Sequence, residues 1–219
     1  MDTVSIYNKD ITQQNEDELV KNVYEKIAGH FDNTRAYVWS WISDFKSNIT
    51  DDDIYVDIGC GNGRNLRESN CIGIDNCESF LQICREKYTD IPLYKCCITN
   101  LDKLNDKSCD WILCIAMFHH LTTRERRIDA LREMKRILKP GKSHRVLLSV
   151  WSINQPKKTR RTFHYGDNIV KWNKFGKIYN RYYYIFRLEE LKELFEETGW
   201  KIYSHKWDCG NEAFEMYYE

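Results

Sequence analysis

The stretch VDIGCGNGRNL, residues 56–66, places three glycines at every second position directly after a short apolar run. Such a run is typical of a buried strand, and glycine lets the backbone turn tightly and approach a ligand with no Cβ in the way. The next apolar run ends in Asp75, 18 positions after Asp57. In sheets that bind nucleosides, an acid near this spacing hydrogen-bonds a ribose diol. The sequence therefore predicts a nucleoside-containing ligand at this turn.

Strand and helix patterns alternate on both sides of the loop. We expect strands at 54–58, 71–75, 92–98, 110–117 and 144–151, and an antiparallel hairpin from 200–208 and 213–219. Helical spacing covers 16–31, 39–45, 77–87, 122–139 and 187–199. This alternation indicates an α/β fold with a mostly parallel seven-stranded sheet and a C-terminal antiparallel hairpin. We expect a flexible leader at 1–15 and a single domain at 16–219, with a polar, basic insert at about 152–181.

The composition excludes several classes of protein. The chain has 219 residues, 42% of them hydrophobic, and 33 basic side chains balance 33 acidic ones. Overall charge therefore does not point to nucleic acid, and any basic surface must be local. Nine cysteines without a CxxC pair argue against a disulfide framework or a zinc site, so we expect no metal. We predict no membrane span and no secretory signal, and a cytoplasmic location with the nucleus also open.

The glycine spacing separates two kinds of cofactor loop. Dinucleotide loops usually read G-x-G-x-x-G, whereas this chain reads G-x-G-x-G from Gly59 to Gly63. That pattern suits a ligand with amino and carboxylate ends rather than a pyrophosphate. The loop resembles the first motif of class I S-adenosylmethionine-dependent methyltransferases, which have a Rossmann-like fold. Many such enzymes carry an adenine-binding acid where this chain has Cys97, so the backbone and Ile98 are the alternative adenine contacts.

A longer resemblance narrows the family. The segment CIAMFHHLTTRERR, residues 114–127, is similar to the family that methylates the carboxylate of 5-carboxymethyluridine at the tRNA wobble position, position 34. Residues 23–39, 166–172 and 181–199 resemble further blocks of that family in order, although Lys171 replaces a proline. The resemblance covers most of residues 16–219. It implies S-adenosylmethionine as cofactor and tRNA as substrate.

The resemblance also implies a set of site residues. A carboxylate is already ionised at neutral pH, so its methylation needs positioning rather than a general base. The implied catalytic residues are Arg35, His119, His120 and Trp151. The implied cofactor contacts are Tyr24, His30, Arg35, Asp57, Gly59, Gly61, Asn62, Gly63, Asp75, Cys97, Ile98 and Ile115. Arg35 could hold either the acceptor or the cofactor carboxylate, and Trp151 or Trp172 could stack on the base.

Basic residues near the expected active site suggest RNA contacts. Lys157, Lys158, Arg160 and Arg161 lie together, interleaved with aromatic residues, in the stretch after the fifth strand. Such a cluster favours phosphate binding, although most charge runs are solvated loops. The remaining candidates for RNA contact are Arg124, Arg126, Arg127 and Trp172. The three arginines could equally form a solvated helix face.

The third expected strand lies at a sheet edge and carries few charges. Open edges of this kind are normally blunted or covered. The family resemblance implies a small zinc-binding activator subunit that pairs with this edge in a heterodimer, with Leu93, Tyr94 and Ile98 as anchors. The alternative cover is the N-terminal leader of the chain itself.

Two other functions stay open on the sequence alone. A small-molecule methyltransferase of the quinone or sterol type would share the glycine loop and the LKPG turn at 138–141. Its acceptor site should be apolar, which leaves the basic cluster unexplained. A non-catalytic RNA-binding subunit with a decayed cofactor site is the other alternative, and Cys97 is its main support.

Overall fold

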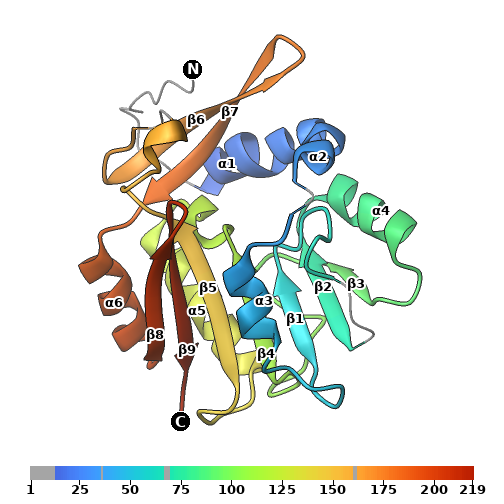
Figure 1. The fold of residues 1–219 in the computed structure, drawn as a ribbon, viewed down its shortest axis with the longest axis vertical. Coiled ribbons are helices and arrows are strands. Elements are labelled where there is room, and N and C mark those ends of the chain that lie inside the picture. The colour runs from blue at the N-terminus through green and yellow to red at the C-terminus, as the bar shows by residue number, and fades with distance from the viewer. Residues whose placement is uncertain (1–12, 36, 67–69, 160–161) are drawn as a thin grey trace.

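A twisted seven-stranded sheet forms the centre of the computed structural model, which describes residues 13–35, 37–66, 70–159 and 162–219 (Figure 1). The strand order is β3-β2-β1-β4-β5-β9-β8. The strands are β1 (Tyr55–Ile58), β2 (Cys71–Asp75), β3 (Leu93–Lys95), β4 (Trp111–Ile115), β5 (Arg145–Trp151), β8 (Lys201–Asp208) and β9 (Asn211–Tyr217). The first five are parallel, and β9 runs antiparallel to both β5 and β8. The predicted fold class is confirmed.

Helices cover both faces of this sheet, as buried parallel strands require. They are α1 (Gln13–Glu16), α2 (Asn22–Thr34), α3 (Ser40–Lys46), α4 (Glu78–Lys87), α5 (Arg124–Ile137) and α6 (Leu188–Glu197), with a π-helical turn η1 (Asp17–Lys21) and 3-10 turns η2 (Phe118–His120) and η3 (Lys157–Thr159). Alternate residues of the strands enter two cores, one beneath α5 and α6 and the other beneath α3 and α4. The side-chain period of two in a strand produces this division.

A β-hairpin occupies most of the predicted basic insert, which sequence analysis described only as a polar stretch. Its strands are β6 (Gly166–Lys174) and β7 (Lys177–Ile185), and they form a separate two-stranded sheet. Trp172 and Tyr182 pack against Val20 and Ile27 in a third core. The hairpin therefore lies beside the N-terminal helices, above the carboxyl ends of the parallel strands, and its tip projects from the body of the protein (Figure 1).

The β3 edge is shorter than predicted. The strand ends at Lys95, and the chain then turns inward. Ile98 is therefore only 4% exposed and belongs to the core beneath α5 and α6. Ile98 is therefore unavailable as an anchor for a partner, whereas Leu93 and Tyr94 are half-buried on the edge strand. Residues 1–12 of the predicted leader lie outside the described residues. Within the described ranges, no helix is long and apolar enough to cross a membrane.

Candidate active site

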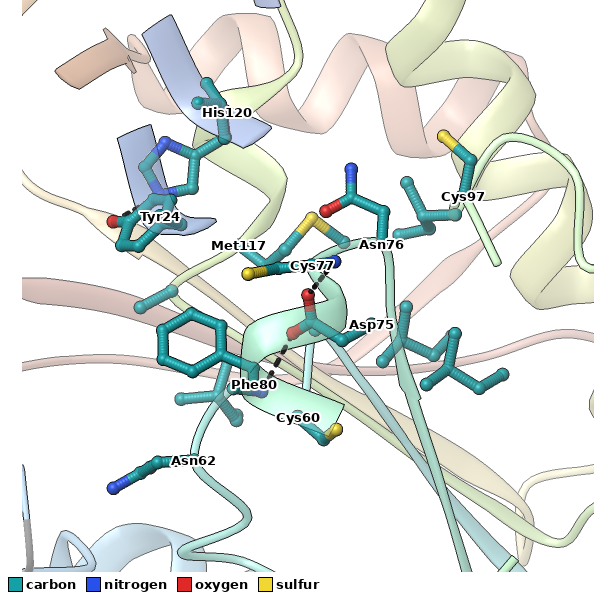
Figure 2. Close-up of a pocket in the computed structure, with 18 of the residues that line it drawn as sticks. Tyr24, Cys60, Asn62, Asp75, Asn76, Cys77, Phe80, Cys97, Met117 and His120 are labelled. Atoms are coloured by element: carbon teal, nitrogen blue, oxygen red, sulfur yellow. Dashed lines mark hydrogen bonds between the residues drawn. The ribbon is translucent and has the colours of Figure 1, made fainter. Parts of the chain in front are cut away.

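The glycine loop and the acid of β2 are joined directly. Asp75 accepts hydrogen bonds from the backbone N–H of Gly61 and of Cys77, each at 2.9 Å (Figure 2). Burial raises the pKa of Asp75 to about 6. Gly61 has a φ of +55°, and an added Cβ would meet no atom within 4 Å. The loop thus adopts a conformation that suits glycine and leaves its backbone open to the adjoining cavity.

A cavity runs from this loop between the N-terminal helices and the ends of β2 and β4. Tyr24 closes one side of it, and Met117 and Cys97 lie on others (Figure 2). Of the predicted cofactor contacts, those in its lining are Tyr24, Gly59, Gly61, Asn62, Asp75, Cys97, Ile98 and Ile115. His120, predicted as catalytic, also lines this cavity. Because the lining combines an open glycine backbone, a buried carboxylate and apolar walls, it suits a nucleoside.

Asp57 lies behind the loop rather than in the cavity wall. Its side chain is 1% exposed, and its Oδ2 atom has no hydrogen-bond partner among the described residues. Burial raises the pKa of Asp57 to about 7, although the charges of Arg64 and Lys46 oppose this shift. A buried carboxylate oxygen without a partner is costly, so it fits a site completed by a ligand or its water shell. This arrangement fits S-adenosylmethionine, whose ammonium group carries such a water shell and would be attracted by the buried carboxylate.

A second cavity adjoins the first. Tyr24, Phe31, Arg64 and Ala116 line both cavities. The second is also lined by Thr34, Arg35, Tyr37, Trp39, Trp151, Gln155, Arg181, Tyr183, Cys209, Gly210 and Asn211. The predicted catalytic residues Arg35 and Trp151 are thus brought together beside the cofactor cavity.

The boundary between the cavities includes a strained residue. Ala116 follows β4 with a φ of +54°, a region that residues other than glycine seldom occupy. Its N–H donates to the carbonyl and the hydroxyl oxygen of Ser149 at 3.1 and 3.0 Å, which holds this conformation. Strained backbone of this kind is concentrated at functional sites, and Ala116 lines both cavities.

Tyr24 is the centre of a polar network on the shared wall. Its hydroxyl lies 3.2 Å from His120 Nε2, 3.2 Å from the hydroxyl of Tyr183 and 3.3 Å from an Arg181 nitrogen. His120 Nδ1 lies 2.7 Å from the Tyr182 carbonyl, so Nδ1 carries the proton and Nε2 accepts from Tyr24. Burial lowers the pKa of His120 to about 3, so the ring is neutral at physiological pH.

His119 lies behind the wall of the second cavity. It is fully buried and is not among the described residues that line either cavity. Its Nδ1 accepts the backbone N–H of Trp151 at 3.2 Å, and its ring stacks on Tyr183 with centroids 4.7 Å apart. Burial holds the pKa of His119 well below its usual value. His119 therefore contacts Trp151 and Tyr183, which line the second cavity, without lining it itself.

Two predicted contacts are wrong in position. Trp172 is 9% exposed, and its Nε1–H donates to His30 Nδ1 at 3.1 Å. It therefore cannot stack on an RNA base, and His30 is not among the described cavity residues. Instead, the Trp172 ring lies 5.6 Å from the Arg35 guanidinium and 4.8 Å from that of Arg181. Trp172 thus holds two arginines of the second cavity by cation–π contacts.

Arg127 is likewise unavailable to RNA. It is 3% exposed and donates to the carbonyls of Leu121 and Thr122 at 3.1 and 3.3 Å. Its guanidinium lies 3.5 Å from the centroid of the Tyr184 ring. The Arg127 side chain thus joins the loop after η2 to the Tyr184 ring of β7.

Arg124 and Arg126, the other two α5 arginines predicted to contact RNA, also pair with acids, as Arg127 does with Glu190 at 3.8 Å. Arg126 binds Glu16 at 2.7 Å and also donates to Cys97 Sγ at 3.4 Å, which links α1 to the cofactor cavity. Arg124 is exposed and pairs with Glu197 of α6. In the basic cluster, Lys157 is exposed on η3. The side chains of Lys158, Arg160 and Arg161 lie outside the described residues.

Sequence reasoning missed several residues of the two cavities. Among them are Glu16, Arg64, Met117, Arg181 and Tyr183. Arg181 and Tyr183 come from β7, which was not predicted as a strand. The signal was present, because residues 166–185 are rich in aromatic and β-branched residues on both sides of a Phe-Gly turn.

Known proteins resemble both the sequence and the fold. Residues 56–145 match the model of the family described as "Methyltransferase domain". The chain is 31% identical over 223 residues to a tRNA (carboxymethyluridine(34)-5-O)-methyltransferase of Schizosaccharomyces pombe, covering 90% of this chain and 94% of that protein. It is 38% identical over 143 residues to tRNA (carboxymethyluridine(34)-5-O)-methyltransferase ALKBH8 of Macaca fascicularis, covering 64% of this chain and 21% of that protein.

A solved structure supports the fold alone. The 1,6-didemethyltoxoflavin-N1-methyltransferase of Burkholderia thailandensis, solved with S-adenosylhomocysteine, superposes with a TM-score of 0.68 at 13% identity, covering 100% of this chain and 96% of that one. The chain spans about a fifth of the length of the mammalian relative but nearly all of the fission-yeast one. The chain therefore belongs to the class I S-adenosylmethionine-dependent methyltransferases, in the family of the tRNA carboxymethyluridine methyltransferases.

Proposed function

We propose that this protein methylates the carboxylate of 5-carboxymethyluridine at the wobble position of tRNA. The observation that carries the proposal is the charge of the second cavity. Arg35, Arg64 and Arg181 line it, and its described lining includes no aspartate, glutamate or histidine. A cluster of guanidinium groups beside the cofactor cavity suits a small carboxylate, which arginine binds through paired hydrogen bonds.

The aromatic lining suits the base that carries this carboxylate. Trp151, Tyr183 and Tyr37 line the same cavity, and Trp151 and Tyr183 lie with ring centroids 4.4 Å apart. Aromatic side chains hold unpaired bases by stacking. The fission-yeast relative, which matches this chain over most of its length, carries the same activity in its name.

The chemistry needs orientation rather than proton transfer. When bound, S-adenosylmethionine supplies an electrophilic methyl group, and the acceptor carboxylate is already an anion. Arg35 and Arg181 orient this anion, and the aromatic walls exclude water from it. His120 accepts the Tyr24 hydrogen bond and is neutral, so it holds the wall that both cavities share. At saturating cofactor, the rate of methyl transfer should therefore show no titration of a general base on the acceptor between about pH 6 and pH 8.

We also propose that a small zinc-binding activator subunit pairs with β3. The fold supports this proposal because β3 is an edge strand of the sheet and carries the half-buried Leu93 and Tyr94. Strand addition would satisfy the outer backbone groups of this edge. Assays of the activity should therefore be run with and without such a subunit.

Nucleoside mass spectrometry tests the proposed reaction. Transfer RNA carrying 5-carboxymethyluridine is incubated with protein and isotopically labelled S-adenosylmethionine, digested and analysed. We expect label in the methyl ester of 5-carboxymethyluridine, and none in tRNA that lacks the carboxymethyl group. The Asp75→Ala variant is the matched control for the cofactor cavity. Label in a different nucleoside would refute the proposal, as would no label from a protein that binds S-adenosylhomocysteine and is supplied with the activator subunit.

A further inference from the structure

The turn of the β6–β7 hairpin displays an aromatic side chain to solvent. Phe175 and Gly176 form the two-residue loop between the paired Lys174 and Lys177. Both loop residues have positive φ, 51° and 86°, as in a type I′ turn. Phe175 is 88% exposed. The first position of such a turn favours asparagine, aspartate or glycine, so neither turn geometry nor core packing explains a phenylalanine there.

Side chains at the hairpin tip contact helix α2. Lys174 Nζ donates to the carbonyl of Lys26 at 2.6 Å, and Asn173 Oδ1 accepts the Gly176 N–H at 2.8 Å. The Phe175 ring lies edge-on to His30 with centroids 5.0 Å apart. The exposed ring is therefore held by the fold on one side, which reduces the ordering cost of stacking on its other side.

Positive charge is concentrated around this ring. Residues 152–187 contain nine lysines and arginines and a single acid, Asp167, in a chain whose net charge is zero. Lys177 is exposed beside Phe175, and Lys26 is exposed on α2. Cations interleaved with a solvent-facing aromatic ring complement a polyanion that carries unpaired bases.

The same strand connects the tip to the acceptor cavity. Arg181 and Tyr183 line that cavity, and Phe175 precedes Arg181 by six residues along the hairpin. At roughly 3.3 Å per residue this separation is about 20 Å, which is several nucleotides along an RNA strand. An RNA whose reactive base occupies the cavity would thus extend over the tip.

We propose that the hairpin tip is an RNA-binding arm. Phe175 stacks on an unpaired base outside the reactive nucleotide, and Lys177 contacts the adjacent phosphate. The proposal rests on the proposed tRNA substrate, because it names where the rest of that RNA is held. Its occupant is the anticodon stem-loop, whose unpaired loop surrounds the wobble base.

Binding of an unmodified anticodon stem-loop tests the arm without requiring methyl transfer. Phe175→Asn keeps a residue that favours positive φ but removes the ring, so thermal stability should hold or rise while RNA affinity falls about 5- to 100-fold. Phe175→Tyr should keep the wild-type affinity. Lys177→Glu should weaken binding and reduce the slope of log affinity against log salt by about 1. S-adenosylhomocysteine affinity, measured by calorimetry, should be unchanged in all three variants.

Lys142→Glu is the matched control, because Lys142 is exposed in the turn before β5, at the opposite end of the sheet from both cavities, and the substitution changes the net charge equally. It should leave RNA affinity unchanged. If Phe175→Asn loses RNA affinity but the wild type forms no methyl ester, the proposed reaction is overturned and the RNA-binding arm is supported. Wild-type RNA affinity in Phe175→Asn and Lys177→Glu would overturn the arm, and an acidic protein surface would then be the better occupant of the tip.

Discussion

Replacing Asp57 by asparagine should make the stability of the protein less sensitive to pH. The substitution keeps the shape of a side chain that is buried at the end of β1 and removes its charge. Burial raises the pKa of Asp57 from 3.8 to about 7. At about 1.4 kcal/mol per unit, the ionised form costs the folded state up to about 4 kcal/mol. The charges of Arg64 and Lys46 have already reduced this cost.

The direction of the effect follows from proton uptake. Because the folded-state pKa lies above the unfolded one, the contribution of Asp57 to stability is full below about pH 4 and is lost as the pH rises through 7. Between pH 5.5 and 8.5 this loss amounts to about 2 kcal/mol in the wild type. The Asp57→Asn variant does not lose this stability. Between pH 5.5 and 8.5 its unfolding free energy should therefore rise by about 2 kcal/mol relative to that of the wild type.

Urea unfolding of both proteins without cofactor, at several pH values across this range, measures the difference. Asp52→Asn, at an exposed position near the start of β1, is the matched control and should follow the wild-type curve. Calorimetry should show weaker S-adenosylhomocysteine binding by Asp57→Asn, because the ligand ammonium would lose the attraction of the buried carboxylate behind the loop. Parallel stability curves for wild type and Asp57→Asn would show that the buried carboxylate is not destabilised, and the reasoning would fail.

Three further substitutions address the two cavities and the edge strand. Asp75→Ala should abolish measurable S-adenosylhomocysteine binding, because each lost charge-assisted hydrogen bond costs roughly 1.5–3 kcal/mol. Its circular dichroism spectrum should stay native. Wild-type affinity in this variant would remove Asp75 from the site. Arg35→Ala should sharply lower tRNA methylation, and Arg35→Lys should restore only part of it because lysine lacks the paired donors; full turnover in the alanine variant would contradict its role. Tyr94→Asp should prevent co-purification of the activator subunit and leave S-adenosylhomocysteine binding intact, and an unaffected complex would place the interface elsewhere.

Short-range patterns in the sequence were sufficient to predict the strands of the sheet and its cofactor loop. The five parallel strands and the C-terminal hairpin were predicted with errors of up to three residues at their ends, the largest in β3, because buried strands and amphipathic helices carry distinct periods. The start of α5 is equally local, because the side chain of Thr123 accepts the backbone N–H of Arg126. The positions of Asp75 and the glycines followed from the same local logic, since a turn directly after a strand has few conformations.

Only the tertiary structure decided which charged and aromatic side chains reach the site. Arg127 and Trp172 are the kinds of residue that a sequence suggests for RNA contact, yet both are buried because β7 and α2 pack over them. Arg181 is far from the motifs along the chain, and the hairpin brings it to the Tyr24 hydroxyl. Contacts between residues more than 100 positions apart depend on how whole elements pack, and no local pattern encodes that packing. The sequence alone therefore determined the cofactor loop, whereas the fold determined the acceptor cavity.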